Sequence, residues 1–467
     1  MRARLAVPAV AVLALLSYGA ADAVDVAPGA LTLAAPVPAP TPAPRPTPSD
    51  PPRASTGPVL AGLSAQALAP TSAGVARTLG PLLASPALGS RVSAYVVDAV
   101  SGDVLLDSAG QRPQVPASTA KLLTGAAVLA TVGGSTRLST RAVQGAPDEV
   151  ILVGGGDMLL GPAGSTTAVA GRAGLDDLAG QVVAALTADG QTEVVVRFDD
   201  TAFAGPNAAP GWAAADLSFG YAGRVAALGL ASDRARPGRP SSTDPALTAA
   251  QAFGAALVRA GVAVSGAPVR AVAPEQARVL GEVASAPVAE VLALALAESD
   301  NALAEALARL VARALGRPTT FKDAAAAVLD AVQELGVDTG PTTISDTSGL
   351  APGSLVPARV LGDVLALGAG PGQPQLRPLL EGLPVAGFSG TLADRFGATR
   401  TRGAAGVVRA KTGTLTGSSA IAGTTVDDDG RLLLFVVMAD RVPASGTLAA
   451  RAALDRVTAA LAACGCR

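Results

Sequence analysis

The stretch Pro116-Ala117-Ser118-Thr119-Ala120-Lys121-Leu122 carries the strongest structural signal in the chain. It places a hydroxyl and an amine three residues apart at the start of an apolar segment, residues 122–131, which predicts a helix. Positions i and i+3 of a helix share a face, so Ser118 and Lys121 are expected side by side near a helix N-terminus. A serine there has a base within reach and the positive helix end behind it. The stretch thus predicts a nucleophile with its base.

Composition narrows the chemistry open to this pair. No histidine occurs among the 467 residues, which excludes Ser-His-Asp and Cys-His arrangements and any histidine-bound zinc. A catalytic base must therefore come from Lys, Asp, Glu, Tyr or Cys, and this favours Lys121. The net charge of -2 without a long basic run argues against a nucleic-acid partner.

Two further motifs follow in order: Ser299-Asp300-Asn301 and Lys411-Thr412-Gly413-Thr414. Each motif alone is weak, because a helix N-cap, a solvated helix lysine or an exposed strand lysine explains it equally well. The three together, in this order and in a chain without histidine, resemble the signature of serine β-lactamases and penicillin-binding proteins. We therefore interpret them as parts of one site for acyl transfer.

Acyl transfer assigns a role to each polar group. Ser118 is the expected nucleophile, and Lys121 can take its proton if burial and the nearby Lys411 cation lower the pKa of Lys121. Ser299 is expected to relay a proton towards the leaving amine. Asn301 is expected to hold a substrate amide and to hydrogen-bond Lys121.

The third motif is expected to bind the substrate. Lys411, Thr412 and Thr414 offer a cation and two hydroxyls to a terminal carboxylate. Gly413 is expected to let the substrate approach the strand backbone closely. The backbone N–H groups of Ser118 and Thr414 are the expected oxyanion donors. No metal or organic cofactor is expected.

The N-terminal segments predict an exported protein. Arg2 and Arg4 precede the apolar run 5–16, and Ala21-Asp22-Ala23 fits a cleavage site, so residues 1–23 are predicted to be a signal peptide. An uncleaved signal would instead leave an N-terminal membrane anchor. The Pro/Ala-rich residues 24–58 are predicted to form a semi-rigid linker. The expected location is secreted, periplasmic or associated with the cell wall.

The folded part is predicted to consist of a catalytic domain, 59–137 and 241–467, interrupted by a strand-rich inserted subdomain, 138–240. The two cysteines, Cys464 and Cys466, are expected to be free or intermolecular thiols, because a disulfide across one glycine would be strained. Strands are predicted at 91–98, 103–107, 149–153, 192–198, 407–412, 419–426 and 431–439, and helices at 72–79, 175–186, 245–260, 288–298, 302–315 and 448–462.

Several further stretches extend the resemblance to residues 75–445. They are Gly154-Gly155-Gly156-Asp157 (with Met158 where proline is usual), Trp212 with Asp216 and Tyr221, Asp346-Thr347-Ser348-Gly349-Leu350, Ser389-Gly390-Thr391-Leu392 with Arg395, and Arg409-Ala410 before Lys411. In these the chain resembles the D-Ala-D-Ala carboxypeptidases of the penicillin-binding protein 4 type, peptidase family S13. The resemblance implies an α+β penicillin-binding or serine β-lactamase-like fold, with a five-stranded antiparallel sheet flanked by helices. It also implies inserted subdomains, and the short interval between Ser118 and Ser299 indicates that the inner one is missing or reduced.

The predicted function is that of a serine D-Ala-D-Ala carboxypeptidase acting on peptidoglycan stem peptides, with cleavage of D-Ala-containing cross-links as an additional activity. β-Lactams are the expected covalent inhibitors, acylating Ser118. One alternative is a serine β-lactamase with the same motifs and fast deacylation. The other is a non-catalytic penicillin-binding or wall-binding module.

Overall fold

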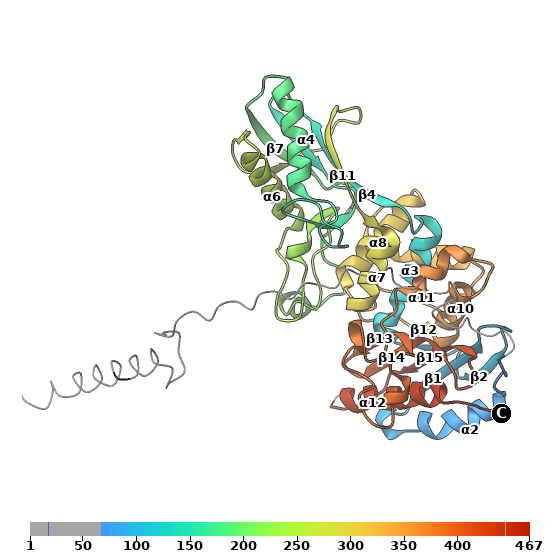
Figure 1. Cartoon of the computed structure of the whole chain (residues 1–467). Helices are drawn as coiled ribbons and strands as arrows, with labels where there is room; N and C mark the ends of the chain where they lie inside the picture. The colour runs from blue at the N-terminus through green and yellow to red at the C-terminus, as the bar shows by residue number, and fades with distance from the viewer. Residues whose placement is uncertain (1–16, 18–66, 444) are drawn as a thin grey trace, which may run out of the picture. The chain divides into compact units, whose positions relative to one another are not determined.

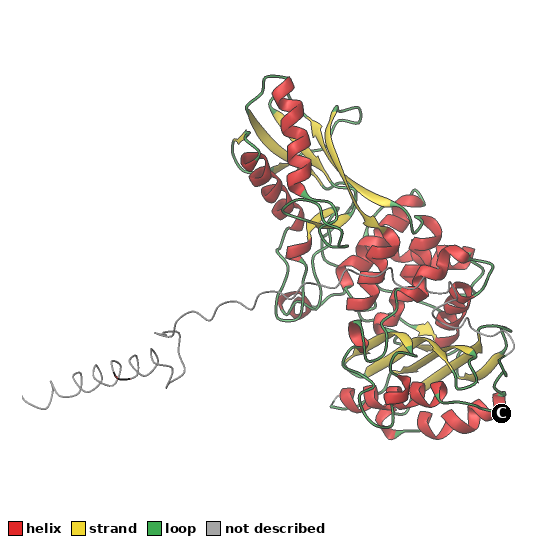
Figure 2. Ribbon diagram, viewed as in Figure 1, coloured by secondary structure: helices red, strands yellow, loops and turns green. Residues whose placement is uncertain are grey.

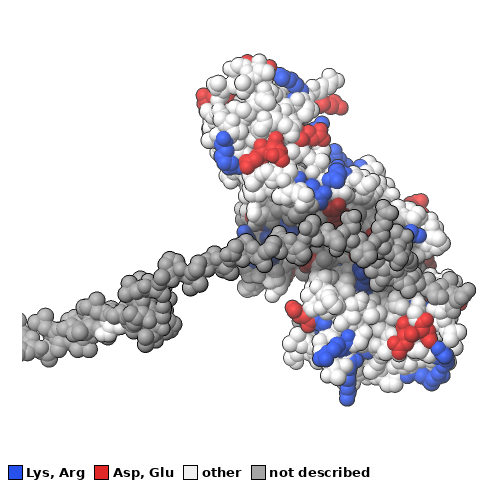
Figure 3. All heavy atoms as spheres, viewed as in Figure 1, with Lys and Arg blue, Asp and Glu red and all other residues white. Residues whose placement is uncertain are grey.

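Two β-sheets organise the part of the chain that this computed structural model describes, namely Ser17, residues 67–443 and residues 445–467 (Figure 1, Figure 2). The predicted signal peptide and linker, 1–58, lie outside the described residues except for Ser17. Within the described residues, no helix has both the length and the hydropathy needed to cross a bilayer. On the face drawn in Figure 3, acidic and basic side chains are interspersed, in keeping with the small net charge of -2.

The first sheet has five strands in the order β13-β14-β15-β1-β2, and every neighbouring pair is antiparallel. This confirms the sheet that the sequence predicted, an early hairpin joined to three late strands. Successive residues of a strand face opposite sides, so Tyr95 and Val97 enter one core while Ala94 and Val96 enter another. The strands are β1 (Val92–Asp98), β2 (Val104–Ser108), β13 (Arg409–Leu415), β14 (Ser418–Val426) and β15 (Leu432–Ala439).

Helices cover both faces of this sheet (Figure 2), which confirms the α+β fold class. One core packs α2 (Ser72–Leu83) and α12 (Thr447–Ala462) against the sheet. The other core contains α3 (Lys121–Thr131), α7 (Val288–Glu298), α8 (Asn301–Ala314), α9 (Phe321–Glu334), α10 (Ala358–Ala369) and α11 (Arg377–Glu381). Because α3 is apolar on nearly all sides, it is buried almost throughout, and it holds its N-terminus fixed beside the sheet.

The second sheet lies in the middle of the chain, with the order β10-β7-β5-β4-β11 and β9 beside β7. Its strands are β4 (Arg137–Gln144), β5 (Glu149–Val153), β7 (Glu193–Asp199), β9 (Ala263–Val264), β10 (Val269–Arg270) and β11 (Val279–Pro287). Helices α4 (Leu175–Ala188) and α6 (Pro245–Arg259) share its core. Shorter pairs join β3 (Pro113–Gln114) to β12 (Val356–Pro357) and β6 (Asp157–Leu160) to β8 (Leu228–Leu230).

Elements after residue 241 also belong to the inserted unit that contains the second sheet. The sequence predicted a return to the catalytic domain at residue 241, but α6 and β9–β11 pack with the second sheet, and β11 pairs with β4. The chain leaves this sheet only at Pro287. The predicted division stays a prediction, and we propose 137–287 as the inserted segment.

The two cysteines differ from their prediction. Cys464 and Cys466 form a disulfide, and their Cα atoms lie 4.9 Å apart, within the range that a disulfide spans. The expectation of free or intermolecular thiols is therefore wrong. The tail folds back on α2, where the Cys466 carbonyl accepts the Thr71 N–H at 2.7 Å, and this turn brings the two sulfur atoms together.

Candidate active site

The predicted nucleophile, Ser118, lies in a 3-10 turn, Ala117–Ala120, that leads directly into α3. The turn packs against β13 with almost no space between the two backbones. A Cβ atom added at Gly413 would lie 2.6 Å from the Pro116 carbonyl oxygen and 3.1 Å from the Ala117 Cβ. Ala117 itself has a φ of 46°, which is rare for a residue with a side chain. Gly413 thus serves the close packing of the protein, a reason different from the substrate approach that the sequence suggested.

Lys121 is buried, with 1% of its surface exposed, and its amine contacts three groups. Nζ lies 3.0 Å from Ser118 Oγ, 2.6 Å from Asn301 Oδ1 and 2.7 Å from the Ser348 carbonyl oxygen. Burial lowers the pKa of Lys121 to about 8, although the charges of nearby carboxylates oppose this shift. The structure thus brings Ser118, Lys121 and Asn301 together and gives the amine a pKa suited to a general base.

The second motif forms the junction between α7 and α8. Ser299 adopts a left-handed conformation with a φ of 56°. Asp300 caps α8 by accepting the Leu303 N–H at 2.9 Å. Its other oxygen accepts two hydrogen bonds from Arg234, at 3.0 and 2.7 Å, and Arg234 also donates to Glu298 at 2.8 Å. The mostly buried Arg234 therefore fixes the junction that presents Ser299.

Lys411 lies behind Ser299 and is fully buried. Its Nζ donates to Ser299 Oγ at 3.0 Å and to the Thr412 carbonyl oxygen at 2.9 Å. Burial lowers its pKa well below the usual value, and the charge of Lys121 lowers it further. The predicted coupling of the two lysines is therefore present, but its resolved effect is on the pKa of Lys411.

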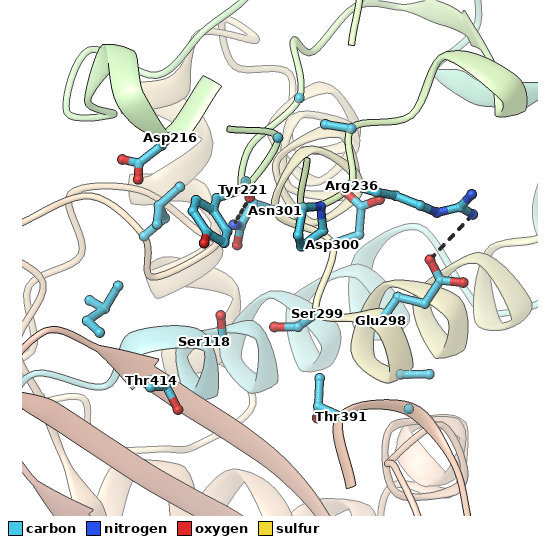
Figure 4. A pocket seen from close by; sticks show the side chains of 18 of the residues that line it. Ser118, Asp216, Tyr221, Arg236, Glu298, Ser299, Asp300, Asn301, Thr391 and Thr414 are labelled. Carbon is cyan, nitrogen blue, oxygen red and sulfur yellow. Dashed lines mark hydrogen bonds and ion pairs between the residues drawn. The ribbon is translucent and has the colours of Figure 1, made fainter. Parts of the chain in front are cut away.

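A cavity of about 810 Å³ opens above these groups (Figure 4). Figure 4 shows the hydroxyls of Ser118 and Ser299 on its floor, with Thr391 and Thr414 on one side. Of the third motif only Thr414 lines the cavity, whereas Thr412 is mostly buried and donates to Thr391 at 2.8 Å. The prediction that Lys411, Thr412 and Thr414 bind a terminal carboxylate stays a prediction, and Thr414 is the one of the three that lines the cavity.

The opposite wall comes from the segment after β7. Asp216 and Tyr221 lie on it, and the Tyr221 carbonyl accepts the Asn301 amide at 2.7 Å. Figure 4 places Asp216 at one end of the cavity and Arg236 at the other, where Arg236 lies 4.0 Å from Glu298. Sequence reasoning noted Asp216 and Tyr221 only as points of resemblance. It missed Arg236 and Glu298, since no motif marks them.

From the sequence we also expected two oxyanion donors, the backbone N–H groups of Ser118 and Thr414, and no metal. Ser118 and Thr414 both line the cavity, and β13 is an edge strand, which presents backbone N–H groups that no strand pairs. Their assignment as oxyanion donors stays a prediction. Among the described residues there is no group of three or more metal-ligating side chains.

Comparison with known proteins gives consistent matches over nearly the whole chain. The model of the D-Ala-D-Ala carboxypeptidase 3 (S13) family matches residues 75–238 and 231–461. The carboxypeptidase DacB of Mycolicibacterium smegmatis is 38% identical over 424 residues, covering 89% of this chain and 90% of the relative. The carboxypeptidase Rv3627c of Mycobacterium tuberculosis is 38% identical over 410 residues, covering 86% of each chain.

Solved structures match in the same region. Penicillin-binding protein 4 of Haemophilus influenzae superposes with a TM-score of 0.66 at 20% identity, covering 82% of this chain and 97% of that chain. A second structure of that protein, in complex with a β-lactam, superposes with a TM-score of 0.56. At this identity the likeness shows a shared fold, which is the penicillin-binding fold that the sequence predicted.

Proposed function

The chain belongs to the D-Ala-D-Ala carboxypeptidase 3 (S13) family, a family of serine hydrolases, and on that premise we propose that it releases the terminal D-alanine of peptidoglycan stem peptides through an acyl-enzyme on Ser118. The observation that carries the proposal is the contact set around Ser118: Lys121 as base, Asn301 beside it, and Ser299 backed by Lys411. Ser118, Ser299 and Asn301 line one cavity, and the two buried lysines contact the serine hydroxyls from behind.

Acylation begins with neutral Lys121. Its amine takes the proton of Ser118 Oγ, and the oxygen forms a bond to the carbonyl carbon of the penultimate D-alanine. The carbonyl oxygen becomes an oxyanion, which the N–H groups of Ser118 and Thr414 are proposed to stabilise. The terminal carboxylate of the substrate contacts the hydroxyls of Thr414 and Thr391.

Collapse of the tetrahedral intermediate breaks the C–N bond and needs a proton on the leaving amine. Ser299 relays to that amine the proton that Lys121 took from Ser118, so Lys121 becomes neutral again, and Lys411 holds the Ser299 hydroxyl in place through its hydrogen bond. Water then attacks the ester while the neutral Lys121 accepts one of its protons, and Lys121 passes that proton to Ser118 Oγ as the ester C–O bond breaks. The shortened peptide leaves as a carboxylic acid, which ionises in water, and Ser118 and neutral Lys121 are regenerated.

The same steps describe two related reactions. When the leaving amine belongs to a neighbouring stem peptide, the reaction cleaves a cross-link. When the scissile amide lies in a β-lactam ring, the leaving amine stays attached to the acyl group and the adduct persists. Penicillin-binding protein 4 of H. influenzae, which shares the fold, has been solved with a β-lactam, and this supports β-lactams as ligands of this chain.

Export fits this substrate, since peptidoglycan lies outside the membrane. The support is the arginine-flanked apolar run 5–16 with its cleavage signal at residues 21–23, and we propose that the chain is secreted, periplasmic or wall-associated. Fractionation of cells that express the full chain tests this. Activity confined to the cytoplasm would contradict it.

The test of the main proposal is intact-mass analysis after exposure to benzylpenicillin. The wild-type protein should gain the mass of one β-lactam, and Ser118→Ala should gain none. An unmodified wild type would contradict the mechanism. Incubation with purified muropeptides, followed by mass analysis, then separates loss of terminal D-alanine from cleavage of cross-links.

The same preparations decide between the alternatives. Prompt turnover of a chromogenic cephalosporin would favour a β-lactamase, while a long-lived adduct favours the peptidase. A folded protein that binds penicillin but releases no D-alanine from a pentapeptide would indicate a binding module.

A further inference from the structure

Glu305 is a buried acid close to the active site that the mechanism above does not use. It lies on α8, one helical turn after Asn301, and none of its surface is exposed. Burying a carboxyl group is unfavourable unless hydrogen bonds compensate for the lost water. Burial, assisted by the charge of Asp346, raises the pKa of Glu305 to about 8. A carboxyl group that is fully buried next to the active site therefore calls for a structural or functional explanation.

The contacts of Glu305 lead directly to the predicted base. Its Oε1 accepts the backbone N–H groups of Thr347 and Ser348, at 2.7 and 2.8 Å. The carbonyl oxygen of Ser348 in turn accepts Lys121 Nζ at 2.7 Å. The Thr347 carbonyl accepts the Thr124 hydroxyl of α3 at 2.8 Å. Glu305 therefore ties the loop at 347–348 to α8, and that loop holds Lys121.

Two fixed acceptors decide where the amine of Lys121 points. A neutral amine has two N–H bonds and one lone pair, whereas an ammonium has three N–H bonds. When Asn301 Oδ1 and the Ser348 carbonyl take the two N–H bonds of neutral Lys121, its lone pair faces the third neighbour, Ser118 Oγ, at 3.0 Å. Asn301 and Glu305 are four residues apart, so one face of α8 fixes both acceptors.

We propose that Glu305 is a positioning residue for acylation: by holding the Thr347–Ser348 loop, it aims the lone pair of neutral Lys121 at Ser118 Oγ. The proposal rests on the proposed function, since it takes Lys121 as the base. Glu305 does not line the cavity, and it acts only through the loop and through its charge.

The charge of Glu305 should alter the pH dependence of acylation, which a purely structural residue would leave unchanged. Four charged groups face Lys121. Three are the carboxylates of Asp346, Asp300 and Glu305, whose negative charges raise the pKa of Lys121, and the fourth is Lys411. An ionised Glu305 therefore favours the protonated, inactive amine. Glutamine keeps an acceptor oxygen at this position but cannot ionise, so Glu305→Gln removes the charge effect and preserves the hydrogen bonds.

The experiment measures the rate of benzylpenicillin acylation from pH 5 to pH 10 on purified full-length variants. Glu305→Gln should keep its plateau rate within about threefold. Below pH 8, where burial keeps Glu305 uncharged, the two profiles should coincide, whereas above pH 8 the variant should reach its plateau at a pH lower by about half a unit or more. Glu305→Ala should lose about 100-fold in acylation rate at every pH, because the Ser348 carbonyl is no longer held in place. Thermal unfolding is measured in parallel for each variant.

Arg309 provides the matched control, because it is equally buried on α8 and lies one turn beyond Glu305. Its guanidinium donates to the carbonyl oxygens of Ala204 and Pro206, at 3.1 and 3.0 Å. Arg309→Gln should lower the melting temperature and leave the plateau rate of acylation unchanged.

Each outcome decides the proposal. A folded Glu305→Ala that acylates like wild type overturns it, and so does an unshifted profile for Glu305→Gln. If Glu305→Ala does not fold, the profile of Glu305→Gln alone decides. A wild type that forms no adduct would instead refute the assignment of Ser118 and Lys121, a result distinct from failure of the Glu305 proposal.

Discussion

Lys411 Nζ lies 3.0 Å from Ser299 Oγ, so the site contains a second serine–lysine pair beside Ser118 and Lys121. The two lysines are buried close enough for the charge of Lys121 to lower the pKa of Lys411. Two ammonium groups at this distance destabilise each other, and the favoured state holds one proton fewer. The arrangement places a buried amine next to each of the two serine hydroxyls, Ser118 and Ser299, that take part in proton transfer.

Ser299→Ala tests this second pair. It removes the hydroxyl that passes the proton to the leaving amine, and we expect kcat for a D-Ala-D-Ala peptide to fall about 100-fold. Alanine keeps the Cβ atom of serine in the same left-handed backbone conformation. The melting temperature of the variant is recorded as a check on its folding. A folded Ser299→Ala with unchanged kcat would remove Ser299 from the mechanism.

Lys121→Arg tests the base. A guanidinium keeps the positive charge but does not release its proton at accessible pH, so it cannot accept the proton of Ser118. We expect acylation by benzylpenicillin to fall by about three orders of magnitude or more, as followed by intact mass over hours. Circular dichroism controls for folding, because arginine is larger than the buried lysine. Substantial acylation by a folded variant would show that the base is another group.

The pH dependence of acylation follows from the same lysine. Lys121 has a pKa of about 8 and is active when neutral, so the rate should rise about tenfold per pH unit below pH 8 and level off above it. The rise must come with increasing pH, since deprotonation creates the base. Stopped-flow measurement with a chromogenic β-lactam between pH 5 and pH 10 reports this limb. A flat profile would contradict a titrating lysine base.

Arg234 and Arg236 form a matched pair, because both contact Glu298 but differ in burial. The Arg234 side chain is 6% exposed and also binds Asp300, which is 10% exposed, whereas Arg236 is 54% exposed. Removing one partner of a buried pair leaves a charge without compensation, so Arg234→Ala should lower the free energy of unfolding by about 3 kcal/mol. Arg236→Ala should change it by less than about 0.5 kcal/mol. Urea unfolding compares the two, and equal effects would contradict this account.

The motifs predicted which side chains meet, because acyl transfer requires particular groups and few arrangements supply them without histidine. The residues that hold those groups were not predictable in the same way. Glu305 and Arg234 contact partners 42 and 66 positions away, and no local spacing encodes such contacts. The loop after Asp346 was recognised as a motif, but an irregular loop has no periodicity that reveals its contact with Lys121.

Secondary structure was predicted best where apolar residues form a long uninterrupted run. The helix predicted at 288–298 matches α7 residue for residue, and five predicted strands form the first sheet. Helix α9 was not predicted, although its apolar and polar residues lie on different faces. Helix α6 was predicted, but its periodicity does not say which sheet it covers. The sequence therefore placed the return to the catalytic domain at residue 241, whereas we propose that it follows Pro287.

The packing of Gly413 against the turn of Ser118 also has a consequence for adaptation under antibiotic selection. The floor of the site is backbone against backbone, and a methyl group at position 413 would meet the Pro116 carbonyl. A substitution at position 413 would displace Ser118 and so impair its reaction with the substrate as well as with a β-lactam. We expect the variation that lowers β-lactam susceptibility to arise instead on the rim, at positions such as Tyr221, Arg236 and Thr416, where side chains face the open cavity.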